Sequence, residues 1–480
     1  MSFYRRALTA VLALCLSGFV ALAPARADVL IENVTLVNIQ AGTVSPQKSV
    51  LIEGATITAI GADLKNVPSV PTIDAADGFL IPGLWDSHVH IFSDTAEPDT
   101  ALPLYLLNGI TGLRDMGALW PIEAQQDLQR RIETGEVLGP RLILAGAWVD
   151  ASPGSWPGMF LADTPEDARA VVDRIRAEGW SAVKAYSMLD EPTYHALADA
   201  AREAGLPLIG HIPERVSLRT ALEAGQSGIE HFGRVPMACS TQEGAMLRDL
   251  RAAMDRDADL REIFGVMAAR NRIILDSWDA ALCAQVLSDM AAARLHVSPT
   301  LVVAGFYAGT RPALISRRMR LLPAKVRDAW TQPDFRLDAM TDEVRALAAD
   351  SIALDRRTFA LAHEAGVPIL ASSDASFANP YLFHGFSLLD ELDIYVAAGL
   401  TPQEALFTAT VAPARFFQLA DQDGTIAAGR RADLVLLRDN PLEGLATLRD
   451  PELVIAGGQL LDRAALMALE AALMAAGDKN

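Results

Sequence analysis

The sequence predicts an α/β protein in which a (β/α)8 TIM barrel carries a small β-sandwich domain built from both ends of the chain. Two observations predict this fold. First, eight short apolar segments alternate with helix-length amphipathic segments over roughly 300 residues, which is the size and pattern of a (β/α)8 barrel with insertions. Second, strand-like runs punctuated by Gly, Asn and Asp lie on both sides of this region.

The length and composition are those of an ordinary globular protein. The 480 residues suffice for two to three domains, or for one large barrel with an accessory domain. Hydrophobic residues make up 51% and charged residues 21% of the chain. The formal net charge of −19 repels phosphate backbones, so we expect no nucleic-acid partner. The 3 cysteines show no CxxC spacing, which excludes a Cys-based zinc module and a disulfide framework.

Residues 1–27 have the pattern of a secretory signal peptide. Arg5 and Arg6 precede the apolar run 7–23, and Ala25-Arg26-Ala27 places small residues where a signal peptidase reads them. An uncleaved membrane anchor is the alternative, although the run is at the lower edge of a span. We therefore expect an exported, periplasmic or secreted protein without a stable membrane anchor after cleavage.

The composite β-sandwich domain is expected to comprise residues 28–80 and 413–480. Short β-branched runs in the first part indicate a small antiparallel sheet: 29–31, 34–37, 50–52 and 57–60. The strand pattern returns after the barrel, in 424–437 and 453–460, and is followed by a final helix near 461–474.

The barrel is expected to comprise residues 81–412. Its eight predicted strands are 80–90, 112–116, 141–147, 182–186, 207–212, 228–232, 297–303 and 368–375. Helices are predicted between them, among others at 165–178, 191–204 and 341–365. The segment 233–296 is longer than a plain βα loop, and we expect a helical insertion there.

The first barrel strand ends in Asp86-Ser87-His88-Val89-His90. Residues i and i+2 of a strand point to the same side, so His88 and His90 can bind one metal ion together. Two such histidines alone are weak evidence, because they could be surface residues. Their position strengthens the interpretation, since barrel enzymes place their chemistry at the carboxyl ends of the strands.

Four further residues stand within or at the ends of predicted barrel strands. Lys184 lies inside the apolar fourth strand, where an unpaired ammonium is costly to bury, although an ion-paired lysine is the alternative. His211 and His231 end the fifth and sixth strands, and Asp374 ends the eighth. Each of these alone could be structural. Together with the first two histidines they favour a metal site.

With these residues in this order, the sequence strongly resembles the metal-dependent amidohydrolase superfamily, in particular its prolidase-like and imidazolonepropionase-like branch. The resemblance covers nearly the whole chain after residue 27. It rests on the segments 82–90, 109–117 and 139–141, on the ordered Lys184, His211, His231 and Asp374, and on the closing segment 424–437.

The resemblance implies a centre of two divalent metal ions. His88 and His90 would bind the more buried ion with Asp374, and His211 and His231 the more exposed one. Nitrogen-rich ligands suit Zn2+, and Mn2+ or Co2+ can substitute for it.

The resemblance also implies that Lys184 is N-carboxylated by carbon dioxide, so that its new carboxylate bridges both ions. Carboxylation requires a neutral amine, and burial lowers the pKa of a lysine in the required direction. Deaminase-type sites usually lack this bridging lysine.

We therefore expect an exported binuclear amidohydrolase acting on the C–N bond of small-molecule amides, such as dipeptides or N-acyl amino acids. Two ions lower the pKa of a bridging water and polarise the scissile carbonyl. Asp374 is expected to take the proton of the bridging hydroxide and pass it to the departing nitrogen. The alternatives are a cyclic-amide hydrolase, a mononuclear deaminase, or a non-catalytic metal-binding scaffold. A serine hydrolase is disfavoured because no G-x-S-x-G motif is present.

Two substrate contacts are proposed from position in the sequence. Tyr186, two residues after Lys184, faces the same side of the strand and can donate to a substrate carbonyl; a structural tyrosine is the alternative. His384 lies in the loop after the eighth strand and is the second candidate. We expect Arg114 and Asp115 to form a structural pair behind the site. A homo-oligomer is compatible with the sequence.

Overall fold

The computed structural model describes residue 26 and residues 28–62, 64, 67, 69–117, 119–255, 260–308, 315–334 and 342–477. The signal segment predicted at 1–27 lies outside these residues, apart from Arg26. Among the helices of this described part, none combines the length and the hydropathy of a membrane span.

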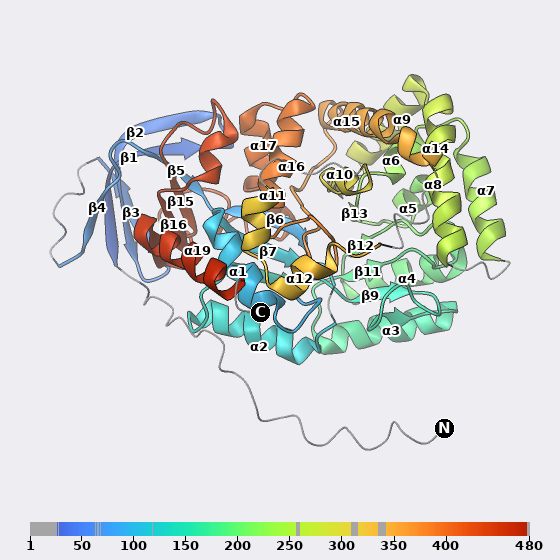
Figure 1. Ribbon diagram of the computed structural model, residues 1–480, viewed down its shortest axis with the longest axis horizontal. Coiled ribbons are helices and arrows are strands. Elements are labelled where there is room, and N and C mark those ends of the chain that lie inside the picture. Colours follow the sequence, from blue (N-terminus) through green and yellow to red (C-terminus); the bar gives the residue numbers. More distant parts are fainter. Residues whose placement is uncertain are drawn as a thin grey trace, which may run out of the picture.

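An eight-stranded sheet at one end of the molecule joins the two ends of the chain (Figure 1). Five strands precede the barrel region: β1 (Val29–Asn38), β2 (Thr43–Glu53), β3 (Thr56–Gly61), β4 (Thr72–Asp74) and β5 (Phe79–Pro82). Three follow it: β15 (Leu434–Leu437), β16 (Leu453–Ala456) and β17 (Gln459–Asp462). The two sets meet where β5 pairs with β15 in antiparallel register.

The sheet is mixed, and the expectation of a purely antiparallel sheet was wrong. The strands β1, β2 and β3 pair antiparallel, but β4 and β5 both run parallel to β1. Short apolar runs specify that a strand forms, and they carry no information on the direction of its neighbour.

The uninterrupted apolar sequence of β15 is explained by burial on both faces of the sheet. Leu434 and Leu436 pack into the core of the sheet itself, whereas Val435 and Leu437 pack into the main core of the protein. This alternation follows from the two-residue period of a strand. The sheet is therefore fixed to the rest of the chain by a shared apolar layer.

The central region is built from short parallel strands in three groups. The first group is β6 (Leu84–Val89), β7 (Ile110–Asp115) and β8 (Arg141–Leu144). The second is β9 (Trp148–Asp150), β10 (Phe160–Leu161), β11 (Val183–Ala185) and β12 (Leu208–Gly210). The third is β13 (Gly228–Glu230) with β14 (His296–Ser298). The predicted strands thus pair within three groups.

The eighth predicted strand, 368–375, is not a regular strand. It makes isolated parallel bridges from Ile369 to Val297 and from Ala375 to Val89, and so connects β14 with β6. Asp374 has a positive φ of 57°, in the left-handed region, which interrupts an extended backbone. The segment still occupies the expected place between its neighbours.

Several helices begin and end where the sequence predicts them. The helices α3 (Pro165–Glu178) and α4 (Glu191–Ala204) have the predicted bounds. Thr164 and Asp167 form a capping box on α3, and Asp190 caps α4, so side chains satisfy the first backbone N–H groups. The predicted helix 341–365 is divided into α14 (Asp342–Ala346) and α15 (Ala348–Glu364).

The insertion at 233–296 is helical, as predicted. It comprises α6 (Arg234–Ala238), α7 (Glu243–Met254), α8 (Leu260–Ser277) and α9 (Ala280–Ala292). A disulfide between Cys239 and Cys283, which the sequence reasoning did not predict, ties the end of α6 to α9. Both half-cystines are fully buried.

The remaining helices cover the parallel strands and the end of the sheet (Figure 1). They are α1 (Glu97–Leu107), α2 (Ile122–Thr134), α5 (Leu218–Glu223), α10 (Val303–Tyr307), α11 (Ile315–Arg320), α12 (Ala324–Ala329), α16 (Phe386–Ala397), α17 (Pro402–Thr408), α18 (Val411–Phe416), the 3-10 helix η1 (Leu445–Arg449) and α19 (Arg463–Gly477).

Candidate metal centre

Three of the predicted ligands converge on one point. Nε2 of His88 lies 3.2 Å from Nε2 of His90, and each of these nitrogens lies 3.3 Å from Oδ1 of Asp374. In the part of the chain that the structure describes, these side chains form a group whose ligand atoms all lie within 4.8 Å of one another. The group joins the end of β6 to the segment 368–375, which bridges β14 and β6.

The hydrogen bonds of the two histidines leave their Nε2 atoms as electron-pair donors. Nδ1 of His88 donates to Glu230 at 2.8 Å, and Nδ1 of His90 donates to the carbonyl oxygen of Gly117 at 3.0 Å. A carbonyl oxygen can only accept, so the ring hydrogen of His90 is on Nδ1. Burial lowers the pKa of His88 well below its usual range, which keeps that ring neutral. Two lone pairs and a carboxylate oxygen therefore face one another, and this donor set fits a divalent cation.

Asp374 is ionised at neutral pH. Burial acts to raise the pKa of its carboxyl group. The nearby His90, His231 and Lys184 outweigh burial, so the pKa lies below its ordinary value. The backbone is held in place by a hydrogen bond from the Asp374 N–H to the carbonyl oxygen of His88, at 2.8 Å.

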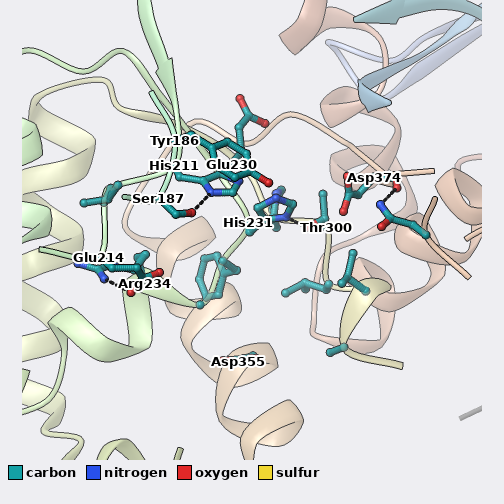
Figure 2. A pocket seen from close by; sticks show the side chains of 18 of the residues that line it. Tyr186, Ser187, His211, Glu214, Glu230, His231, Arg234, Thr300, Asp355 and Asp374 are labelled. Carbon is teal, nitrogen blue, oxygen red and sulfur yellow. Dashed lines mark hydrogen bonds and ion pairs between the residues drawn. The ribbon is translucent and has the colours of Figure 1, made fainter. Parts of the chain in front are cut away.

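The other two predicted histidines continue the same row of imidazoles. The ring of His231 lies 5.0 Å from that of His88 and 5.0 Å from that of His211, centroid to centroid. Their Nδ1 atoms are engaged by hydroxyls, His211 with Ser187 at 2.9 Å and His231 with Thr300 at 2.7 Å. Figure 2 shows both rings between Tyr186 and Asp374. With Nδ1 engaged, Nε2 is the ligand atom that each ring can offer.

Lys184 is fully buried in the same cluster. Its Nζ donates to the carbonyl oxygen of Met116 at 2.7 Å and lies 5.3 Å from the ring centroid of Trp148. Burial lowers its pKa to about 8, and the negative charges of Glu230 and Asp374 oppose that shift. The lowered pKa increases the share of neutral amine at neutral pH, which is the form that reacts with carbon dioxide.

A cavity of about 600 Å³ opens over this cluster. Five of the six predicted metal-site residues line it, and His88 lies fully buried beneath them: the lining set is His90, Lys184, His211, His231 and Asp374. Tyr186 lines it as well, stacked on His211 with ring centroids 4.2 Å apart. The hydroxyl of Tyr186 accepts a hydrogen bond from Trp156 at 2.8 Å.

His384, by contrast, does not line this cavity. Its side chain is 1% exposed, and its two ring nitrogens bind Tyr105 at 2.9 Å and Glu97 at 3.0 Å. A ring enclosed in this way fixes the loop after residue 375 to α1. The structure therefore corrects the expectation of a substrate contact, because position in a loop does not specify which way the ring points.

Glu230 is a functional residue that the sequence reasoning missed. Its carboxylate accepts from His88 and from Arg114, whose Nη2 lies 2.8 Å from Oε1. The predicted pair of Arg114 with Asp115 is therefore wrong, since Asp115 accepts from the backbone N–H groups of Ile91 and Gly117. An acidic residue inside an apolar strand, directly before a predicted ligand, was the available signal, because a buried carboxylate requires a partner.

Glu230→Gln is expected to weaken both stability and metal binding. The amide still accepts from His88, but Arg114 keeps a buried guanidinium without its counter-charge. We expect the free energy of unfolding to fall by about 3 kcal/mol and metal affinity to fall by about 10- to 100-fold. Urea denaturation of metal-free protein and metal titration measure the two effects, with the exposed Glu223→Gln as control. Unchanged metal affinity would show that Glu230 does not orient His88.

Comparison with known proteins identifies the family of this chain. The Amidohydrolase family matches residues 79–461, and the chain belongs to that family. Adenine deaminase 2 of Agrobacterium fabrum (strain C58 / ATCC 33970) is 23% identical over 445 residues, which cover 91% of this chain and 58% of that protein. The chain thus spans less than two thirds of the length of this relative. Membership of the family confirms the resemblance drawn from the sequence, and with it the class of an amidohydrolase enzyme.

Solved structures with similar folds support the architecture. A bottromycin amidohydrolase has a TM-score of 0.69 and 22% identity, covering 93% of this chain and 90% of that chain. A Xaa-Pro dipeptidase with bound methionine has a TM-score of 0.63 and 20% identity, covering 91% of this chain and 100% of that chain. These likenesses show the fold, a TIM-barrel-like α/β arrangement.

Proposed function

We propose that the chain is a metal-dependent hydrolase of small-molecule amides, with dipeptides and N-acyl amino acids as substrates. The observation that carries the proposal is the convergence of two imidazole nitrogens and one carboxylate oxygen on one point at the cavity wall. The family and the names of the similar structures support a C–N bond as the one that breaks.

We assign two divalent ions, with Zn2+ favoured by the nitrogen-rich ligands. His88, His90 and Asp374 would hold the first, and His211 and His231 the second. The N-carboxylated side chain of Lys184 would lie between them. When bound, such ions act as Lewis acids on a carbonyl and lower the pKa of water.

The residues of the chain supply proton transfer and positioning. In the hydrolysis, water adds its oxygen to the carbonyl carbon, the C–N bond breaks, and the nitrogen leaves as an amine. The ionised carboxylate of Asp374 takes the proton that water gives up and delivers it to the departing nitrogen. Tyr186 lines the cavity next to His211 and is placed to contact the substrate.

Export is part of the proposal. The pattern of residues 1–27 supports it, and so does the disulfide between Cys239 and Cys283, because such bonds persist in oxidising compartments such as the periplasm.

The experiment that tests the proposed function is reconstitution followed by a substrate survey. Protein freed of metal by chelation is loaded with Zn2+ and incubated with pooled dipeptides, N-acyl amino acids, cyclic amides and adenine, and mass spectrometry follows every product. We expect two ions per chain and cleavage of linear amides that is lost after chelation and restored by Zn2+. Ammonia from adenine alone would indicate a deaminase, and metal binding without any turnover would indicate a binding scaffold.

A further inference from the structure

Away from the metal ligands, the cavity wall carries a second cluster of charged side chains. Arg234 of α6 and Arg270 of α8 both donate to Oε2 of Glu214, at 3.1 Å and 2.7 Å. All three line the cavity. In the view of Figure 2, His211 and His231 lie between Glu214 and Asp374, so this cluster and the metal ligands occupy different parts of the wall.

This cluster is positively charged and largely shielded from water. Two guanidinium groups and one carboxylate carry a net charge of +1. Their side chains are 11%, 14% and 8% exposed for Arg234, Arg270 and Glu214. Shielding from water strengthens the field of such a cluster inside a cleft. Guanidinium groups bind carboxylates by paired hydrogen bonds, so a carboxylate is the ligand this charge fits.

A carboxylate stands at another position of the same wall. Asp355 of α15 is half-buried and lines the cavity. No other described side chain forms an ion pair or hydrogen bond with it. Burial alone raises the pKa of Asp355 to about 7, which reflects the missing counter-charge. Buried acidic groups are usually paired with a cation or a hydrogen-bond donor. Because Asp355 lines the cavity, we infer that a cationic group of the ligand supplies this partner.

We propose that this wall binds a substrate with charges of both signs, its carboxylate at Arg234 and Arg270 and a primary ammonium group at Asp355. This inference rests on the proposed function and narrows it. Among small amides it selects dipeptides, which carry both charges, over N-acyl amino acids, neutral cyclic amides and purines. The ammonium group can be the free α-amino group or that of a lysine side chain, and these two sources are distinguished by the substrates below.

The test crosses substrates with variants of the Zn2+-loaded protein. The substrates are Ala–Leu, its C-terminal amide, N-acetyl-Ala–Leu and N-acetyl-Lys–Leu. The variants are Asp355→Asn and Arg270→Gln. Asp350→Asn and Arg272→Gln are matched controls, because these exposed side chains lie on the same helices α15 and α8. For each pair, kcat and KM are measured separately.

We expect wild type to favour Ala–Leu over its amide by about 10- to 100-fold in kcat/KM, mainly through KM. Arg270→Gln should erase this preference. Wild type should also favour Ala–Leu over N-acetyl-Ala–Leu to a similar extent. Loss of this preference in Asp355→Asn would identify the α-amino group as the group that Asp355 binds. If instead N-acetyl-Lys–Leu is the better substrate and Asp355→Asn loses that advantage, the lysine side chain is the source.

Two outcomes would overturn the inference, and only the second would also overturn the proposed function. Cleavage of all four substrates with equal kcat/KM, or preferences that the variants keep, would overturn it and leave the proposed function standing. Failure of wild type to cleave any of the four would overturn the inference together with the proposed hydrolysis of linear amides.

Discussion

Asp374→Asn is expected to lower kcat by about 10³-fold or more, because the variant cannot accept the proton of the attacking water. The pKa of Asp374 lies below its usual value, so the wild-type carboxylate is ionised and available as a base throughout the neutral range. An amide has the same shape, and its N–H can donate to the Nε2 lone pair of His90, so the fold should persist. Steady-state kinetics on the best substrate of the survey measure the loss, and circular dichroism checks the fold.

The control for this prediction separates proton transfer from metal binding. Metal content is measured by mass spectrometry for Asp374→Asn, for wild type and for Asp199→Asn, whose exposed side chain on α4 pairs with Arg202. Loss of turnover at full metal content supports a role in proton transfer. Turnover within tenfold of wild type would refute that role for Asp374.

Lys184→Met is expected to lower kcat/KM by about 100-fold or more. Methionine retains most of the buried volume, so packing around Met116 and Trp148 is preserved. It removes the amine that is expected to become the bridging carboxylate. Addition of acetate, which supplies a small carboxylate to the space left behind, should restore part of the activity. The exposed Lys325→Ala, which breaks an ion pair with Asp94, serves as control.

Carboxylation of Lys184 has its own spectroscopic test. Wild-type protein loaded with Zn2+ is equilibrated with ¹³C-labelled bicarbonate, and carbon NMR should show one carbamate signal that Lys184→Met lacks. The fall of the lysine pKa to about 8 favours this reaction, since only the neutral amine attacks carbon dioxide. Absence of the signal, together with one bound ion per chain, would replace the two-ion centre by a mononuclear one.

The sequence carried enough information to predict that these side chains lie close together, because the ends of parallel barrel strands meet at one face. His88, His211 and His231 each stand at or just after the end of a short parallel strand, and such ends meet at one face. The helices α3 and α4 were predicted with their observed bounds because caps and amphipathic spacing act locally.

What could not be predicted depends on contacts between distant segments. Glu230 orients His88 across 142 positions of sequence, and no spacing rule connects them. His384 lies in a loop whose conformation is decided by Glu97 and Tyr105 of α1. Whether β4 and β5 run parallel or antiparallel to β1 likewise depends on the whole sheet. The apolar pattern of each strand's sequence is the same in both cases.

The disulfide between Cys239 and Cys283 bears on how the protein must be made. The two cysteines are 44 positions apart, and the loop they close contains α7 and α8, and thus Arg270. A loop of this size stabilises the fold by about 4 kcal/mol through the entropy of the unfolded chain. Protein produced in a reducing cytoplasm lacks this bond, while His88, His90 and Asp374 lie outside the loop. Such material retains the candidate metal ligands, but the disulfide no longer constrains the segment that carries Arg270. Substrate selectivity should therefore be measured on protein prepared in an oxidising compartment.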